Sequence, residues 1–215
     1  MLREFELQPI GTVSIEETSS KSLLKLSTRT YWMRVWPAGL GLASHLIERF
    51  GVQGLRGREV LDLGCGVGLL GIVCARLGAR VTFLDREPGA LAAVRKNCRL
   101  NGLGPAQTIG GDWNHGGYRL APSAYDVVVG GDVVYDDMQW QSISTALLRT
   151  LRPGGFALLA DPGWVAQRKL RASFRRSGFS VTKRRREVSW PPWPATYRQH
   201  KDIDIYTLRR REPAP

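Results

Sequence analysis

A glycine-rich stretch behind an acidic residue is the part of this sequence best suited to bind a ligand. It reads Asp62-Leu63-Gly64-Cys65-Gly66-Val67-Gly68, with glycine at every second position after the acid. Glycine lets the backbone turn tightly and lets a ligand approach it closely. The residues before the stretch alternate as in a strand, and apolar residues recur at helical spacing from Leu69 to Leu77. The sequence therefore predicts a strand, a glycine loop and a helix whose free N–H groups face the ligand.

Two classes of cofactor compete for this loop. Residues 66–71 fit the dinucleotide pattern G-x-G-x-x-G, and Asp85 follows at roughly the twenty-residue spacing expected there. The longer stretch 62–68 resembles instead the D/E-x-G-x-G-x-G signature of the seven-strand (class I) S-adenosylmethionine-dependent methyltransferases. The acid before the glycines belongs to that signature and has no role in the dinucleotide pattern. The resemblance implies S-adenosyl-L-methionine as cofactor, with S-adenosyl-L-homocysteine as product. The residues it implies for binding are Asp62, Gly64, Gly66 and Gly68.

Acidic residues also close the next two predicted strands. Asp85 ends the strand predicted over Arg80–Leu84, where a carboxylate can accept hydrogen bonds from both hydroxyls of a ribose, and Arg86 is placed to pack on adenine. Gly110-Gly111-Asp112-Trp113 follows the strand predicted over 106–109. It resembles the adenine clamp of the methyltransferase family, which implies that Asp112 accepts the adenine amine and that Trp113 stacks on the ring. Ligands of such sheets bind at the carboxyl ends of the strands, so we expect these residues to meet the glycine loop.

The methyl acceptor is expected at the end of the strand predicted over Tyr125–Gly130. DNA and RNA amino-methyltransferases usually carry Asp/Asn-Pro-Pro-Tyr/Phe here, whereas this chain has Asp132-Val133-Val134-Tyr135. Cytosine-C5 enzymes need a nucleophilic cysteine, and none lies near. Asp132-x-x-Tyr135 resembles instead the D-x-x-Y motif of the seven-strand protein-lysine methyltransferases, a group that includes the valosin-containing-protein and electron-transfer-flavoprotein β-subunit methyltransferases. This resemblance implies that Asp132 holds the amine and contacts the cofactor, and that Tyr135 hydrogen-bonds or faces the amine.

Two further stretches resemble the same group. Trp36-Pro37-Ala38-Gly39 precedes the core, and the resemblance places Trp36 beside the cofactor. Asp161-Pro162-Gly163 resembles the D-P-G of the flavoprotein-modifying branch. The resemblance covers roughly residues 31–164. The arginine-rich last third and the stretch Trp190–Pro194 match no pattern of the group. The substrate protein, the methylated residue and the number of methyl groups therefore stay open.

Strands and helices alternate along the chain and predict how these residues are positioned. Strands are expected over 59–63, 80–84, 106–109, 125–130, 156–160, 178–187 and 202–208, and helices over 37–50, 69–77, 88–100, 138–151 and 164–177. This alternation is typical of a doubly wound, mainly parallel sheet. The last two strands lack a helix between them, which predicts an antiparallel C-terminal edge strand. The predicted fold class is α/β, with a Rossmann-like seven-strand sheet and a turn at residues 152–155.

The 215 residues are enough for one sizeable domain. Residues 1–30 are predicted to form an N-terminal extension, with a β-hairpin over 3–17 and a polar loop after it. Residues 31–211 are predicted to form a single class I methyltransferase domain.

Composition and charge limit the partners. No apolar run approaches the roughly twenty residues that span a bilayer. Three cysteines without C-x-x-C spacing predict reduced thiols in a cytoplasmic protein, with neither a metal site nor disulfides. Residues 150–215 hold 15 Lys+Arg and 5 Asp+Glu, whereas residues 1–149 hold 16 and 14, so the net charge of +12 lies mainly in the last third. Such a field attracts an acidic protein, RNA or a membrane surface, unless it is only a solvated arginine-rich face.

The leading hypothesis is a monomeric N-methyltransferase that acts on a lysine of an acidic protein. The alternative is an RNA-directed or small-molecule amine methyltransferase, because aromatic residues are interleaved with the basic ones in the last third. A third class, a cofactor-binding regulator without catalysis, is disfavoured by the presence of both Asp132 and Tyr135.

Overall fold

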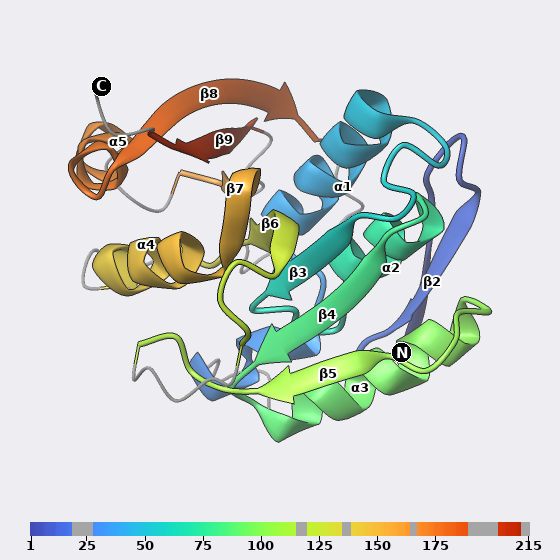
Figure 1. The fold of residues 1–215 in the computed structure, drawn as a ribbon. Helices are drawn as coiled ribbons and strands as arrows, with labels where there is room; N and C mark the ends of the chain where they lie inside the picture. Colours follow the sequence, from blue (N-terminus) through green and yellow to red (C-terminus); the bar gives the residue numbers. More distant parts are fainter. Residues whose placement is uncertain (19–27, 115–119, 135–138, 164–166, 189–201, 212–215) are drawn as a thin grey trace.

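The computed structural model describes residues 1–18, 28–114, 120–134, 139–163, 167–188 and 202–211. Its centre is a seven-stranded sheet in the order β5-β4-β3-β6-β7-β9-β8 (Figure 1). The strands are β3 (Glu59–Leu63), β4 (Arg80–Asp85), β5 (Gln107–Gly110), β6 (Tyr125–Gly131), β7 (Leu151–Asp161), β8 (Phe179–Glu187) and β9 (Asp202–Arg210). The chain moves outward from β3 to β5 and then returns to β6 on the other side of β3. The strand order therefore reverses between β3 and β6, where ligands of such sheets bind.

This topology confirms the predicted Rossmann-like α/β fold. Strands β3 to β7 are parallel, and β9 pairs antiparallel with both β7 and β8, so β8 forms the edge of the sheet. The predicted turn at residues 152–155 is wrong, because these residues belong to β7. Tyr125 of β6 pairs with Leu151 of β7, and Val127 of β6 pairs with Phe156 of β7. Because β7 has more residues than β6 between these two pairs, β7 bulges there. Gly154 has a φ of +76°, which lets the backbone bulge before pairing resumes.

Helices cover both faces of the sheet and enclose two apolar cores. The helices on the first face are α1 (Pro37–Phe50), α2 (Leu69–Arg76) and α3 (Pro88–Leu100), and those on the second are α4 (Gln139–Thr150) and α5 (Gln167–Arg176) (Figure 1). Successive residues of a strand point to opposite faces. Val127 and Val129 accordingly belong to the first core, and Val128 belongs to the second. Within the described ranges, no helix has the length and apolar character needed to cross a membrane.

The N-terminal residues form the predicted hairpin from β1 (Leu2–Glu6) and β2 (Thr12–Glu16). Two asparagines, Asn97 of α3 and Asn101 at its C-cap, bind the backbone of β2. Asn97 Oδ1 accepts a hydrogen bond from Glu16 N at 2.8 Å, and Asn101 Oδ1 accepts one from Ser14 N at 3.0 Å. Asn97 Nδ2 also donates to the carbonyl oxygen of Val67 at 2.9 Å, which joins the hairpin to the glycine loop. The division into an extension over 1–30 and a domain over 31–211 stays a prediction.

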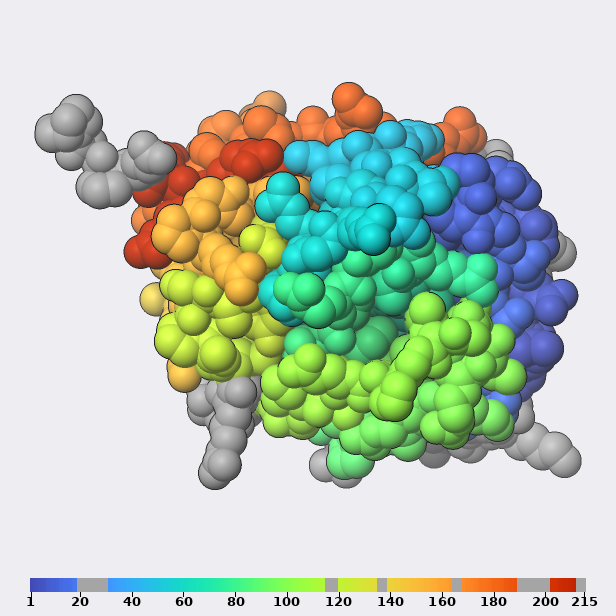
Figure 2. Space-filling model, turned by 45° about the vertical axis from the view of Figure 1, so that its right-hand side comes forward, coloured from blue at the N-terminus to red at the C-terminus, as the bar shows by residue number. Residues whose placement is uncertain are grey.

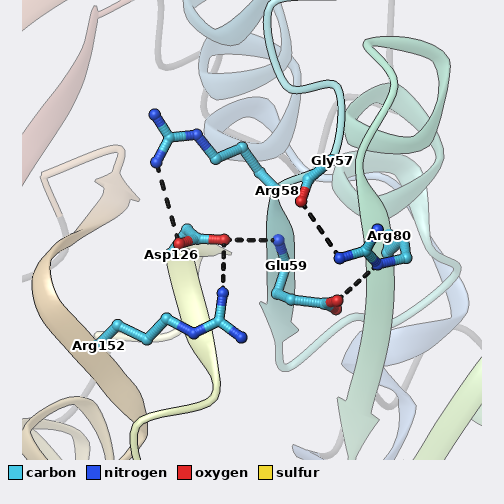
Figure 3. A network of polar contacts seen from close by, with 6 residues as sticks. All are labelled: Gly57, Arg58, Glu59, Arg80, Asp126 and Arg152. Carbon is cyan, nitrogen blue, oxygen red and sulfur yellow. Dashed lines mark hydrogen bonds and ion pairs between the residues drawn. The ribbon is translucent and has the colours of Figure 1, made fainter.

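Charged side chains join the amino ends of β3, β4 and β6 (Figure 3). The glycine loop lies at the opposite, carboxyl ends of the strands. Asp126 Oδ2 accepts hydrogen bonds from Glu59 N at 2.8 Å and from Arg152 Nη1 at 3.0 Å, and Arg58 Nη1 lies 3.9 Å from Asp126 Oδ1. Arg80 Nε donates to Glu59 Oε1 at 2.6 Å. The network therefore holds β3 between its two neighbours.

Replacing Asp126 by alanine should lower the free energy of unfolding by about 1–3 kcal/mol, because the backbone N–H of Glu59 loses its acceptor. Arg58→Ala is the matched control. It removes only a long, exposed ion pair from the same carboxylate and should cost less than about 1 kcal/mol. Urea unfolding of both variants measures the difference. Equally small losses would mean that the hydrogen bond to Glu59 N adds nothing measurable.

Candidate functional site

The loop between β3 and α2 has a shape that requires glycine. Gly64 and Gly66 have φ values of +69° and +52°, which side chains other than glycine rarely adopt. A Cβ on Gly64 would stand 2.8 Å from Val133 Cγ1 and 3.1 Å from Trp113 Cη2. A Cβ on Gly66 would stand 3.3 Å from the carbonyl oxygen of Trp32. Three segments that are distant in the sequence therefore converge on this loop.

Asp62 lies beneath the loop near the end of β3. The residue is 1% exposed, and its Oδ2 accepts a hydrogen bond from Gly71 N at 2.9 Å. Burial raises the pKa of Asp62 to about 7, the Gly71 hydrogen bond acts in the opposite direction, and the charge of Asp85 adds to the rise. Gly68, with φ +91°, forms the N-cap of α2. Asp62 thus holds the first turn of α2, so its part in binding a cofactor, which stays a prediction, is indirect.

Asp85 holds the same loop from the end of β4. Its Oδ2 accepts a hydrogen bond from Gly66 N, and its Oδ1 accepts one from Glu87 N, both at 2.9 Å. Burial raises the pKa of Asp85 against the effect of these two hydrogen bonds. Each carboxylate oxygen has a second lone pair. Asp85 can therefore still accept the ribose hydroxyls predicted for it, and that contact stays a prediction.

The structure brings Arg86, Asp112 and Trp113 together beside the loop. Arg86 Nη1 lies 3.7 Å from Asp112 Oδ2, and Asp112 Oδ1 accepts a hydrogen bond from Asn114 N at 2.8 Å. The ring of Trp113 faces Gly64. Trp113 Nε1 is buried and has no hydrogen-bond partner in the described part of the chain, which costs free energy until an acceptor reaches it. The contacts of these three residues with adenine stay a prediction.

Sequence reasoning missed Trp32, which lies in the 3₁₀ helix η1 (Thr28–Met33). Its backbone passes over Gly66, and a Cβ on Gly89 would stand 2.5 Å from Trp32 Cζ2, so the indole packs on the start of α3. Residues 31–36 hold three aromatic side chains, which is the signal in the sequence that could identify Trp32, whereas the family resemblance points only to Trp36. Trp36 Nε1 donates to the carbonyl oxygen of Tyr31 at 2.7 Å, and the two rings meet edge to face with centroids 5.5 Å apart. The placement of Trp36 beside a cofactor stays a prediction.

Glu17 connects the hairpin to the segment that covers the loop. The residue is 4% exposed, and its Oε1 accepts hydrogen bonds from Val35 N at 3.0 Å and from Arg3 Nη1 at 3.3 Å. Thr18 N donates to the carbonyl oxygen of Met33 at 3.2 Å. The hairpin thereby positions the backbone of η1 over Gly66. A single glutamate after a strand carries no sequence pattern from which this role could be predicted.

Asp132 follows the end of β6, on the opposite side of β3 from Asp85. It has a φ of +57°, a left-handed conformation that is uncommon for residues other than glycine. Its N–H donates to the carbonyl oxygen of Ala160 at 2.9 Å, and both carboxylate oxygens are buried. The next residue, Val133, packs toward Gly64. Asp132 therefore stands next to the glycine loop at the switch point, while Tyr135 lies outside the described residues.

The Asp161-Pro162-Gly163 stretch closes β7 beside Asp132. Asp161 is 1% exposed, and its Oδ2 accepts a hydrogen bond from Gly163 N at 3.0 Å. It pairs in register with Asp204 of β9. Asp204 Oδ1 accepts hydrogen bonds from Lys183 Nζ at 3.0 Å and from Arg185 Nε at 3.1 Å. Two cations of β8 are therefore used to balance a buried acid at this end of the sheet.

Comparison with known proteins places the chain among methyltransferases. A family model described as a methyltransferase domain matches residues 60–155. The protein N-lysine methyltransferase METTL21A of Danio rerio is 31% identical over 209 residues, which cover 93% of this chain and 89% of that protein. The electron transfer flavoprotein beta subunit lysine methyltransferase of Mus musculus is 33% identical over 135 residues, or 62% of this chain and 51% of the relative. The histone-arginine methyltransferase METTL23 of Mus musculus is 34% identical over 116 residues, or 53% and 45%.

The chain thus spans about half the length of the last two relatives and most of the length of METTL21A. Among solved structures, the T. thermophilus 16S rRNA N2 G1207 methyltransferase in complex with AdoMet and guanosine has a TM-score of 0.66. It is 23% identical, and the match covers 98% of this chain and 50% of that one. At this identity the likeness shows the fold alone.

The raised pKa of Asp62 predicts a pH-dependent stability. Between about pH 4 and pH 7 the folded chain keeps a proton that the unfolded chain has released, so this residue's contribution to stability falls as the pH rises through that window. Asp62→Asn keeps the shape and cannot ionise. From pH 5 to pH 8 its free energy of unfolding should rise relative to the native chain by up to about 3 kcal/mol. Urea unfolding at both pH values measures this, and a constant difference would mean that Asp62 is ionised throughout.

Proposed function

Because the chain belongs to the class I S-adenosylmethionine-dependent methyltransferases, in the group of the protein N-lysine methyltransferases, we propose that it methylates a lysine side chain of a protein. The family follows from the similarity to METTL21A along nearly the whole chain. The observation that carries the proposed acceptor is Asp132, an acid held in a left-handed conformation beside the glycine loop. In this proposal the reacting amine approaches a ligand of that loop from the end of β6, where Asp132 lies.

The residues around the loop fit S-adenosylmethionine, the cofactor of this family. Gly64 and Gly66 keep free the space that side chains would fill, and Trp113 has a buried N–H that an incoming acceptor can satisfy. We infer that the glycines hold the methionine part, that Asp85 binds the ribose, and that Asp112 and Trp113 bind the adenine. When bound, the cofactor supplies an electrophilic methyl group on a positively charged sulfur.

Four other residues support this arrangement. Asp62 and Gly68 set the start of α2, and so the shape of the loop. Arg86 lies near the acid proposed for the adenine amine and can pack on the ring. Trp36 is the N-cap residue of α1, whose Gly39 approaches Gly131 beside Asp132, so we keep it as a proposed cofactor contact.

Asp132 positions the amine and attracts its charged form. A lysine has a reference pKa of about 10.4, so forming the neutral amine at pH 7 costs about 4.6 kcal/mol. The transfer forms a bond from nitrogen to the methyl carbon, breaks the bond from that carbon to sulfur, and releases a proton to water. Because this is an in-line displacement, alignment of the amine is the main contribution of the protein. Tyr135 is proposed to hydrogen-bond the amine or to face its charge with the ring.

Arginine is the second candidate acceptor, because METTL23 is a histone-arginine methyltransferase. RNA remains an alternative through the basic last third. A proteome is incubated with the protein and tritiated S-adenosylmethionine, and samples are then treated with nuclease or with protease. This experiment distinguishes lysine, arginine and RNA as methyl acceptors. Label in methyl-lysine supports the proposal, whereas label in methyl-arginine or label released by nuclease would overturn it. A monomeric state and a cytoplasmic location remain part of the proposal.

Trp113→Ala should weaken the binding of S-adenosylhomocysteine by about 1–3 kcal/mol, the usual scale for stacking a base on an aromatic ring. Isothermal titration calorimetry measures the affinity. Trp113 also packs against the second apolar core, so the melting temperature is recorded in parallel. A lower melting temperature with unchanged affinity would place the ring in the core alone.

Asp132→Ala should reduce turnover at least about 100-fold, because the group that orients the amine is lost. Affinity for S-adenosylhomocysteine should fall only modestly, since the glycine loop and Asp85 are intact. Asp132→Asn should regain part of its activity at pH 9–10, where more of the lysine is neutral. Asp126→Asn, which removes a carboxylate from the other end of β6, is the control and should keep its turnover at a temperature where it is folded. Turnover close to that of the native chain in both Asp132 variants would remove this residue from the mechanism.

A further inference from the structure

Three exposed arginines from different elements gather on the face of the sheet that α1 covers. They are Arg49 in the last turn of α1, Arg184 of β8 and Arg209 of β9, and we call them the arginine patch. The guanidinium carbons of Arg49 and Arg209 lie 4.8 and 4.7 Å from the centroid of the Phe156 ring. The ring of Phe50 stacks on Phe156 with centroids 6.3 Å apart. In Figure 2 the end of α1 (light blue) lies at the top of the molecule, bordered by β8 (orange) and β9 (red).

The charges of the arginine patch are not balanced by the described part of the chain. None of its three guanidinium groups forms an ion pair with a described Asp or Glu, and the nearby acid of α1, Glu48, pairs with Arg186. Partial burial lowers the pKa of Arg49, and the charges of Arg209 and Arg184 lower it further. Like charges that are held together cost free energy, and an anion that bridges them removes that cost. The patch is therefore built to receive negative charge.

The arginine patch lies within reach of the proposed acceptor site. Helix α1 begins beside Asp132, because a Cβ on Gly131 would stand 3.0 Å from the backbone of Gly39. An α-helix rises about 1.5 Å per residue, so Arg49 lies about 15 Å along α1 from Gly39. An extended peptide covers that distance with about five residues.

We propose that the arginine patch docks an acidic segment of the protein substrate and so selects which lysine is presented to Asp132. This inference rests on the proposed function. Arginine forks match carboxylates in a bidentate fashion, and rings such as Phe156 keep them aligned. The backbone of an RNA is bound by a longer stripe of cations, because affinity grows with the number of phosphates neutralised. Two guanidinium groups over one ring, with Arg184 near enough for its charge to act on Arg49, therefore favour a short run of Asp or Glu, located about five residues from the lysine in an extended substrate.

The test uses two synthetic peptides, each with a single lysine and a run of glutamates or of glutamines about five residues away. The native chain should show a KM at least about tenfold lower for the glutamate peptide at low salt. The variant R49Q/R184Q/R209Q should lose this preference, with kcat and the affinity for S-adenosylhomocysteine unchanged. The control R56Q/R99Q/R176Q removes the same number of exposed charges elsewhere and should keep the preference.

A lysine-free glutamate peptide, labelled for fluorescence anisotropy, separates docking from catalysis. If it binds the native chain and not the patch variant, the docking surface stands even where no peptide is methylated, which would count against the proposed function alone. Equal KM values for the two peptides with no anisotropy response, or a preference that survives in the patch variant, would overturn the docking proposal. Tighter patch-dependent binding of a single-stranded RNA than of the glutamate peptide would also overturn it and assign the surface to nucleic acid.

Discussion

The hydrogen bond from Gly71 N to the buried carboxylate of Asp62 determines how α2 leaves β3. It anchors the first turn of the helix to the strand that precedes the loop. A Cβ on Gly71 would stand 2.1 Å from Phe83 Cε1, so only glycine allows the helix to pack this close to β4. With both ends of the connection fixed, the residues between them have to turn within a short span. That span requires the positive φ values of Gly64, Gly66 and Gly68, which residues with a side chain rarely adopt.

The loop is then held from segments that are far away in the sequence. Asp85 binds the backbone of Gly66 from one side, and the backbone of Trp32 passes over the same residue. Trp32 depends in turn on the hairpin, because Glu17 binds Val35 N on the far side of η1. The N-terminal hairpin therefore supports the segment that covers the glycine loop. A disturbance of the hairpin reaches the loop through hydrogen bonds between buried groups, which are costly to leave unmade.

The sequence predicts those parts of the site whose residues lie close to one another along the chain. An acid, alternating glycines and an apolar helix start lie within ten residues of one another, so their pattern identified the loop from Asp62 onward. Contacts between distant segments leave no such pattern, which is why Trp32 and Glu17 were missed. Pro153-Gly154-Gly155 has the composition of a turn, and the backbone does bend at Gly154. Pairing with β6 on both sides nevertheless keeps the segment within β7, because the tertiary context outweighs the local preference.

The ion pairs of the basic last third show which of its positive charges are balanced by acidic residues and which are not. Lys183 and Arg185 bind the buried Asp204, so part of the positive charge serves to keep an acid inside the sheet. Arg185 Nη1 also lies 3.7 Å from Asp202 Oδ2, so two carboxylates offset the charges of these two cations outside the molecule. Arg184 and Arg209 of this third have no acidic partner among the described residues, and Arg209 converges with Arg49 of α1 over the ring of Phe156. A net charge by itself indicates only attraction to anions, whereas this convergence locates the proposed docking surface and sets its distance from Asp132.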